Sequence, residues 1–95
     1  MTKAERQWKD RVAQMCCVVC EIEHGAHEGG YVELHHLRKG GWGKQGYKTL
    51  IPLCLNHHRG EEGIHTLGTK AWERKFANQL DLLEKVQDRM KAYQL

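Results

Sequence analysis

The sequence predicts a small α+β domain with a short stranded centre, a helix at its start and a long helix at its end. Three observations lead to this prediction. Apolar residues recur at helical spacing near both ends of the chain, two central segments are rich in β-favouring residues, and cysteines and histidines stand at the spacing of metal ligands. We expect residues 1–95 to form one domain, with a core over about 16–68 that a metal ion reinforces.

Composition narrows the class of protein only slightly. The formal net charge of +3 is a mild basic bias, which alone is weak support for nucleic-acid binding. The first residues are charged rather than apolar, and no run approaches the roughly 20 apolar residues of a membrane span. We therefore expect a protein of the reducing cytoplasm with no membrane partner, in which cysteines are metal ligands rather than disulfides.

The first element expected is a helix over residues 2–15. Trp8, Val12 and Met15 recur at spacings of four and three, with charged residues between them. One face of this helix is therefore apolar and is expected to pack on the core.

A C-x2-C pair, Cys17 and Cys20, follows this helix. Its short bridge lets two thiolates reach one tetrahedral ion, and the alternative is a pair of small buried hydrophobes. Cys16 stands one residue out of register and is expected to be a packed thiol. Residues 21–30 are predicted to form a loop that leaves two histidines in solvent, His24 and His27.

Residues 31–37 have the composition of a short strand. Alternation places His35 and His36 on opposite faces of that strand, with Glu33 on the same face as His35. A bend or bulge is therefore expected if both histidines are to serve one reaction centre.

The next segment, residues 38–48, is a glycine-rich basic loop with two aromatic residues. Such a loop suits a phosphate backbone and an unstacked base, and the alternative is a plain hairpin loop with solvated lysines. The candidate DNA-binding residues are Arg38, Lys39, Trp42, Lys44, Tyr47 and Lys48. Residues 49–53 then form a second short strand, in which Pro52 requires an edge position or the strand's end.

The last part of the chain is predicted to be helical. A short helical segment begins at Asn56 or His57, and Gly60 and Gly63 interrupt it. A long helix over residues 69–93 carries an apolar stripe that is assigned to packing and to no catalytic role; the stripe includes Trp72, Phe76, Leu80, Leu83 and Met90.

Four of the cysteines and histidines complete a structural zinc site. The pair Cys17 and Cys20 and the later pair Cys54 and His57 give two knuckles that close a tetrahedral Cys3His shell. Apart from the two loop histidines, four histidines remain outside this shell. Three imidazoles can hold a divalent metal and a fourth can act as a base near neutral pH, and the four are His35, His36, His58 and His65.

Together these residues resemble the HNH, or ββα-metal, nucleases. The resemblance covers about residues 17–65 and depends on four parts, which are Cys17-x2-Cys20, His35-His36, Leu53-Cys54-x2-His57-His58 and His65. Within that superfamily the chain is similar to the phage recombination-enhancement nucleases that depend on the RecA filament, on account of Ile51-Pro52-Leu53-Cys54 with His57-His58, Gly63-Ile64-His65, and Trp72-Glu73 with Phe76. The implied fold is a zinc-stapled ββα-metal core.

The resemblance implies a role for each remaining histidine. His35 would bind the catalytic metal, and His36 would be the general base. His58 and His65 would complete the metal site, although the spacing between them is longer than in many HNH proteins. Thr49 stands near the usual place of the family's middle asparagine, so the sequence departs from the family pattern at the residue that usually steadies the loop carrying the base, His36.

The implied reaction is one-metal hydrolysis of a DNA phosphodiester by an endonuclease or nickase. His36 would take a proton from water, and Arg59 or Arg38 would add a cation near the phosphate. Magnesium or manganese is the expected working ion, and a histidine-rich shell would also take zinc, nickel or cobalt.

The expected partners are DNA and, as a candidate substrate, single-stranded DNA coated by RecA. The resemblance suggests a phage or prophage protein in bacterial cytoplasm, and the chain would be a monomer or weak dimer. Two alternatives stay open, which are a zinc-stapled DNA-binding module without catalysis and an adaptor whose C-terminal helix pairs with a partner.

Overall fold

The computed structural model describes residues 1–25, 30–37 and 43–92, with the backbone alone for 43–45. The elements are α1 (Lys3–Ala13), α2 (Val18–His24), β1 (Glu33–His36), the 3-10 helix η1 (Gly43–Thr49), β2 (Leu50–Leu53), α3 (Leu55–His58), α4 (Ile64–Leu67), α5 (Thr69–Lys75) and α6 (Gln79–Lys91). The predicted α+β class is therefore confirmed. Within the described residues, no helix is both long enough and apolar enough to cross a membrane.

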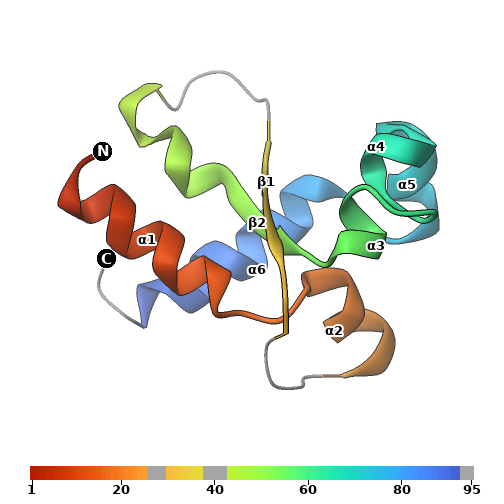
Figure 1. Ribbon diagram of the computed structural model, residues 1–95, viewed down its shortest axis with the longest axis horizontal. Coiled ribbons are helices and arrows are strands. Elements are labelled where there is room, and N and C mark those ends of the chain that lie inside the picture. Colours follow the sequence, from red (N-terminus) through yellow and green to blue (C-terminus); the bar gives the residue numbers. More distant parts are fainter. Residues whose placement is uncertain (26–29, 38–42, 93–95) are drawn as a thin grey trace.

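The two strands form an antiparallel pair at the centre of the molecule (Figure 1). The register is regular over four residue pairs, from Glu33 opposite Leu53 to His36 opposite Leu50. No bulge interrupts these four pairs, so the distortion that we expected near the histidine doublet does not lie within the strand. Pro52 is tolerated because each strand of a two-stranded sheet is an edge strand.

Helices enclose the sheet on several sides. In Figure 1, α1 lies to one side of the strands, α3, α4 and α5 lie to the other, and α6 crosses behind them. Every residue of β2 is buried. The core that forms around this strand is drawn from both ends of the chain and includes Trp8, Val12, Ile51, Leu53, Trp72, Leu82, Val86 and Met90.

The segment after the first cysteine knuckle is a helix, where we expected a loop over residues 21–30. Helix α2 continues to His24, and Gly25 ends it with a φ of 85°. The apolar residues Val18 and Val19 are buried in its first turn, so packing favours the helix although it is only 7 residues long. His24 is exposed, as expected, whereas His27 lies outside the described residues.

The long C-terminal helix expected over residues 69–93 is two helices. Helix α5 ends at Lys75 and α6 begins at Gln79, after Asn78 in an extended conformation. The Asn78 side chain accepts a hydrogen bond from the Leu80 backbone N–H at 2.8 Å, and the Glu73 side chain accepts one from the Gln79 N–H at 2.8 Å. These two caps satisfy two of the free N–H donors of the new helix start, which lowers the cost of the break.

Trp72 fixes α5 against the cysteine-rich half of the molecule. Its side chain is fully buried, and its indole Nε1 donates a hydrogen bond to the His57 carbonyl oxygen at 3.1 Å. Phe76 packs edge-on against both neighbours, with ring centroids 5.5 Å from Trp72 and 5.0 Å from His57. Helix α5 therefore supports the backbone of α3 through a polar bond as well as apolar contacts.

We expect Trp72→Phe to lower the free energy of unfolding by about 2–3 kcal/mol, because it leaves a small void and an unpaired buried carbonyl. Urea titration would measure the change. Trp8→Phe is a matched control, since Trp8 is also buried but its Nε1 has no hydrogen-bond partner among the described residues. An equal decrease in the free energy of unfolding in the two variants would show that the hydrogen bond from Trp72 to His57 does not contribute to stability.

Candidate metal centres

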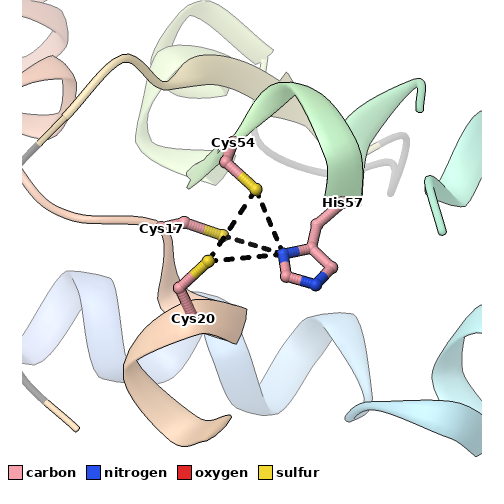
Figure 2. Close-up of side chains that lie close together, drawn as sticks. All are labelled: Cys17, Cys20, Cys54 and His57. Carbon is pink, nitrogen blue, oxygen red and sulfur yellow. Dashed lines mark hydrogen bonds between the residues drawn. The ribbon is translucent and has the colours of Figure 1, made fainter. Parts of the chain in front are cut away.

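Three cysteines and one histidine converge between α2 and α3. Figure 2 shows Cys17 and Cys20 at the start of α2 facing Cys54 and His57 across a small gap. Nδ1 of His57 lies 3.1 Å from the Cys54 sulfur, 3.5 Å from that of Cys20 and 3.6 Å from that of Cys17. The sulfurs of Cys20 and Cys54 lie 3.8 Å apart.

These distances fit a tetrahedral ion. Zinc bonds of about 2.3 Å to sulfur and 2.0 Å to nitrogen give sulfur–sulfur edges of about 3.8 Å and sulfur–nitrogen edges of about 3.6 Å. All four ligand atoms of the cluster lie within 4.8 Å of one another. The cluster could therefore hold a metal ion such as zinc.

The local backbone explains why four ligands meet here. Cys17 and Cys54 are both N-cap residues, of α2 and α3, so each knuckle wraps around the first turn of a helix. Burial raises the pKa of the Cys17 thiol, and burial followed by the charge of Cys17 raises that of Cys20 to about 12. A divalent cation held by these residues would offset this cost, because its charge would favour the thiolates.

An acidic side chain that the sequence did not single out completes this cluster. Nε2 of His57 lies 3.2 Å from the Glu23 carboxylate, on the ring side opposite the sulfurs. A carboxylate in this position favours the tautomer with the proton on Nε2 and leaves Nδ1 free for an ion. The sequence places Glu23 three residues after Cys20, which is one turn of a helix. Glu23 could therefore have been predicted beside the cluster only if residues 18–24 had been predicted to form a helix.

Three further histidines converge on the other side of α3. Nε2 of His58 lies 3.1 Å from Nε2 of His65, and the His35 ring centroid lies 5.3 Å from that of His58 and 5.4 Å from that of His65. Two tetrahedral zinc–nitrogen bonds subtend about 3.3 Å, so the donor set and spacing fit a divalent ion. One pocket is lined by all three together with His36, Leu37, Thr69 and Gln79.

Glu33 orients one of these three histidines. Its carboxylate accepts hydrogen bonds from His58 Nδ1 at 2.7 Å, from the Tyr31 hydroxyl at 2.7 Å and from Arg59 Nε at 3.0 Å. The pKa of Glu33 is lowered to about 2, first by the bond from Arg59 and then by that from His58. In the neutral ring an ionised carboxylate keeps the proton on His58 Nδ1, and Nε2, which lies beside His65, is then the nitrogen available to an ion.

His35 is the buried member of the set, with 9% of its surface exposed. Its Nε2 lies 2.8 Å from the Gln79 side-chain oxygen. Burial lowers the pKa of His35, which favours the neutral ring that metal ligation requires.

Gly63 makes the meeting of His58 and His65 possible. A Cβ at this position would lie 2.6 Å from the Arg59 backbone nitrogen and 2.7 Å from the His58 carbonyl carbon and oxygen. The turn after α3 therefore folds back onto that helix, and α4 begins directly after it with His65 in its first turn. This close return spans the long spacing between the two histidines.

His36 lies at the rim of the same pocket with an exposed side chain. Its Nε2 lies 2.8 Å from the Gly46 carbonyl oxygen, and the Thr49 hydroxyl donates to the same oxygen at 2.7 Å. The backbone of Thr49 also contacts Leu37, because the Thr49 carbonyl oxygen accepts a hydrogen bond from the Leu37 N–H at 3.1 Å. Thr49 thus ties the residue after the doublet to η1.

The structure describes only part of the predicted DNA-binding loop. Arg38, Lys39 and Trp42 lie outside the described residues, as does the side chain of Lys44. Within η1, Tyr47 meets Trp8 edge-on with ring centroids 6.0 Å apart, and Lys48 Nζ lies 5.4 Å from the Trp8 ring centroid. These two side chains therefore pack on α1.

Comparison with known proteins identifies the family. A search of curated proteins found no match. A family model described as recombination enhancement, RecA-dependent nuclease matches residues 1–92, which is nearly the whole chain. That description names nuclease activity in recombination, and it agrees with the narrower of the two resemblances noted from the sequence. The chain belongs to the recombination enhancement, RecA-dependent nuclease family.

Proposed function

We propose that this protein is a metal-dependent DNA endonuclease or nickase of the HNH type. The observation that supports the proposal most directly is the pocket in which His35, His58 and His65 converge while His36 stands at the rim. A metal site with an adjacent unligated imidazole supplies the two components of one-metal hydrolysis. The family description, a RecA-dependent nuclease, supports the same reading.

In this proposal His35, His58 and His65 hold magnesium or manganese, and zinc or nickel can take the same place. The ion, when bound, stabilises the charge that develops on the phosphoryl and leaving oxygens. The chain's own contribution is to fix the rings, since Glu33 holds the proton of His58 on Nδ1 and Gly63 brings His65 within reach.

His36 is the proposed general base. A carbonyl oxygen can only accept a hydrogen bond, so the short contact to Gly46 places a proton on His36 Nε2 and leaves Nδ1 unprotonated. Nδ1 then takes the proton of the attacking water. Thr49 supports this geometry because its hydroxyl donates to the same carbonyl, and it would substitute for the asparagine of the wider family.

Positive charge beside the pocket is proposed to hold the DNA backbone. Arg59 is 60% exposed and pairs with Glu33 at 2.9 Å, so its guanidinium could contact a phosphate from that place. Arg38, Lys39, Trp42 and Lys44 remain proposed DNA contacts outside the described side chains. Because Tyr47 and Lys48 pack on Trp8, we propose that they support the basic loop rather than lead the contact.

The cysteine cluster is proposed to hold structural zinc. Cys54→Ser should release that zinc and unfold the protein, because the binding energy of a structural ion is folding energy. Metal analysis and thermal melting would measure both effects. Cys16→Ser is the matched control, since Cys16 is buried and neighbours the cluster but is not one of its ligands. Retention of zinc and of the melting temperature by Cys54→Ser would refute the assignment.

His36→Ala should reduce nicking of supercoiled plasmid by roughly 10²–10⁴-fold, the usual contribution of a general base. Manganese, magnesium and nickel are each supplied, and plasmid topology is followed on gels. Zinc content and melting temperature should stay at the wild-type values, because the His36 side chain is exposed and binds neither proposed ion.

His24→Ala serves as the control for this assay, because His24 is exposed on α2. Equal nicking by wild type and His36→Ala would refute the assignment of the base. Absence of nicking by the wild type on both plasmid and RecA-coated DNA would contradict the proposed function and favour the zinc-stapled DNA-binding module.

A further inference from the structure

Gln79 lines the histidine pocket although its helix was assigned to packing alone. It is the first residue of α6, and its side-chain oxygen lies 2.8 Å from Nε2 of His35. The two residues are 44 positions apart in the chain, so no local pattern pairs them.

The break between α5 and α6 places Gln79 at this position. Glu73 accepts the Gln79 backbone N–H at 2.8 Å, and the Asn78 side chain caps the new helix by accepting from Leu80. The backbone of Gln79 is therefore held from α5 and from its own N-cap. A helix that ran without interruption would give this residue an ordinary interior position with its N–H bonded to the preceding turn.

We propose that Gln79 is a positioning residue for the metal site, acting through His35. A carboxamide oxygen accepts hydrogen bonds and cannot donate them, so the contact requires a proton on His35 Nε2. The unprotonated nitrogen is then Nδ1, which is left for the ion. This inference rests on the proposed metal site of His35, His58 and His65.

The role matches the one that Glu33 has for His58. In both cases an oxygen acceptor bonds one ring nitrogen of a histidine in the cluster. Such outer partners fix the tautomer and the orientation of a ligand ring, and their loss typically weakens metal affinity by about 10–100-fold. His35 benefits most from a neutral partner because it is the most buried of the three rings.

The experiment compares Gln79→Met with Gln87→Met. Both changes remove one side-chain hydrogen bond from a half-buried glutamine of α6, because Gln87 Nε2 donates to the Lys48 carbonyl at 2.9 Å, away from the pocket. Cobalt is titrated into protein that carries zinc in the cysteine cluster, and binding is followed by the visible absorption of the cobalt ion. Thermal melting is recorded for both variants.

Gln79→Met should bind cobalt about 10–100-fold more weakly than Gln87→Met, at a similar melting temperature. Gln79→Glu should restore the affinity, since a carboxylate accepts the same bond. Equal cobalt affinity in the two methionine variants would overturn the inference. A cobalt spectrum in Gln79→Met that reports a lost ligand would also overturn it, because Gln79 would then bind the ion directly.

The same measurements distinguish a wrong role for Gln79 from a wrong function for the protein. If wild type binds a second equivalent of metal and nicks DNA while Gln79→Met behaves like Gln87→Met, only the role of Gln79 is wrong. If the wild type binds no cobalt beyond the cysteine cluster, the histidine site itself is refuted and the role of Gln79 falls with it.

Discussion

The rest of the molecule depends on two adjacent imidazoles in α3 that leave the backbone in different directions. His57 presents Nδ1 to three sulfurs, and His58 presents Nε2 to His65. A helix of four residues has almost no stability of its own. Helix α3 therefore keeps its shape through the contacts of His57, which are the cysteine cluster at Nδ1, Glu23 at Nε2 and Trp72 at the carbonyl oxygen. The direction of His58 follows from that anchoring.

Strand β1 supplies the other half of the histidine site by simple alternation. Glu33 and His35 are two residues apart and share a face, so one strand face carries both a ring of the cluster and the carboxylate that orients His58. His36 points to the opposite face, yet it lines the same pocket as His35 and Leu37. Because three consecutive residues line it, the pocket opens around the end of β1, where both faces are accessible together. No strand distortion is needed.

The cluster of three cysteines and His57 could be predicted from the sequence because each of its two halves lies within four residues, whereas the set of His35, His58 and His65 was expected only from the family resemblance. A spacing of two residues between Cys17 and Cys20, or between Cys54 and His57, has one main geometric meaning in a reducing environment. The helix break near Asn78 could not be predicted from the apolar stripe, because the stripe continues through it at Phe76 and Leu80. The one residue that indicated a new helix start was Asn78, because asparagine is a favoured N-cap residue. A single such residue is weaker evidence than an apolar stripe that runs through the whole segment.

The groups that orient the ligands were hidden for a different reason. Glu23, Glu33 and Gln79 each act across contacts made by the folded chain, and ordinary polar residues at such positions look like solvated surface in the sequence. Prediction of Gln79 would have required both the helix break and the packing of α6 against the strands.

The two candidate metal centres differ in how far the protein encloses them. This difference decides which of the two sites depends on the other. The cysteine cluster has four ligands, two of them buried, whereas the histidine site has three and includes an exposed His65 on a pocket. An ion in the first would be part of the fold, and an ion in the second would exchange with solvent. Loss of the first would remove the anchor at His57 Nδ1, one of the three contacts that hold the backbone that aims His58. Loss of the second leaves His57 held by its sulfurs, by Glu23 and by Trp72, so the scaffold persists without the ion at which chemistry is proposed.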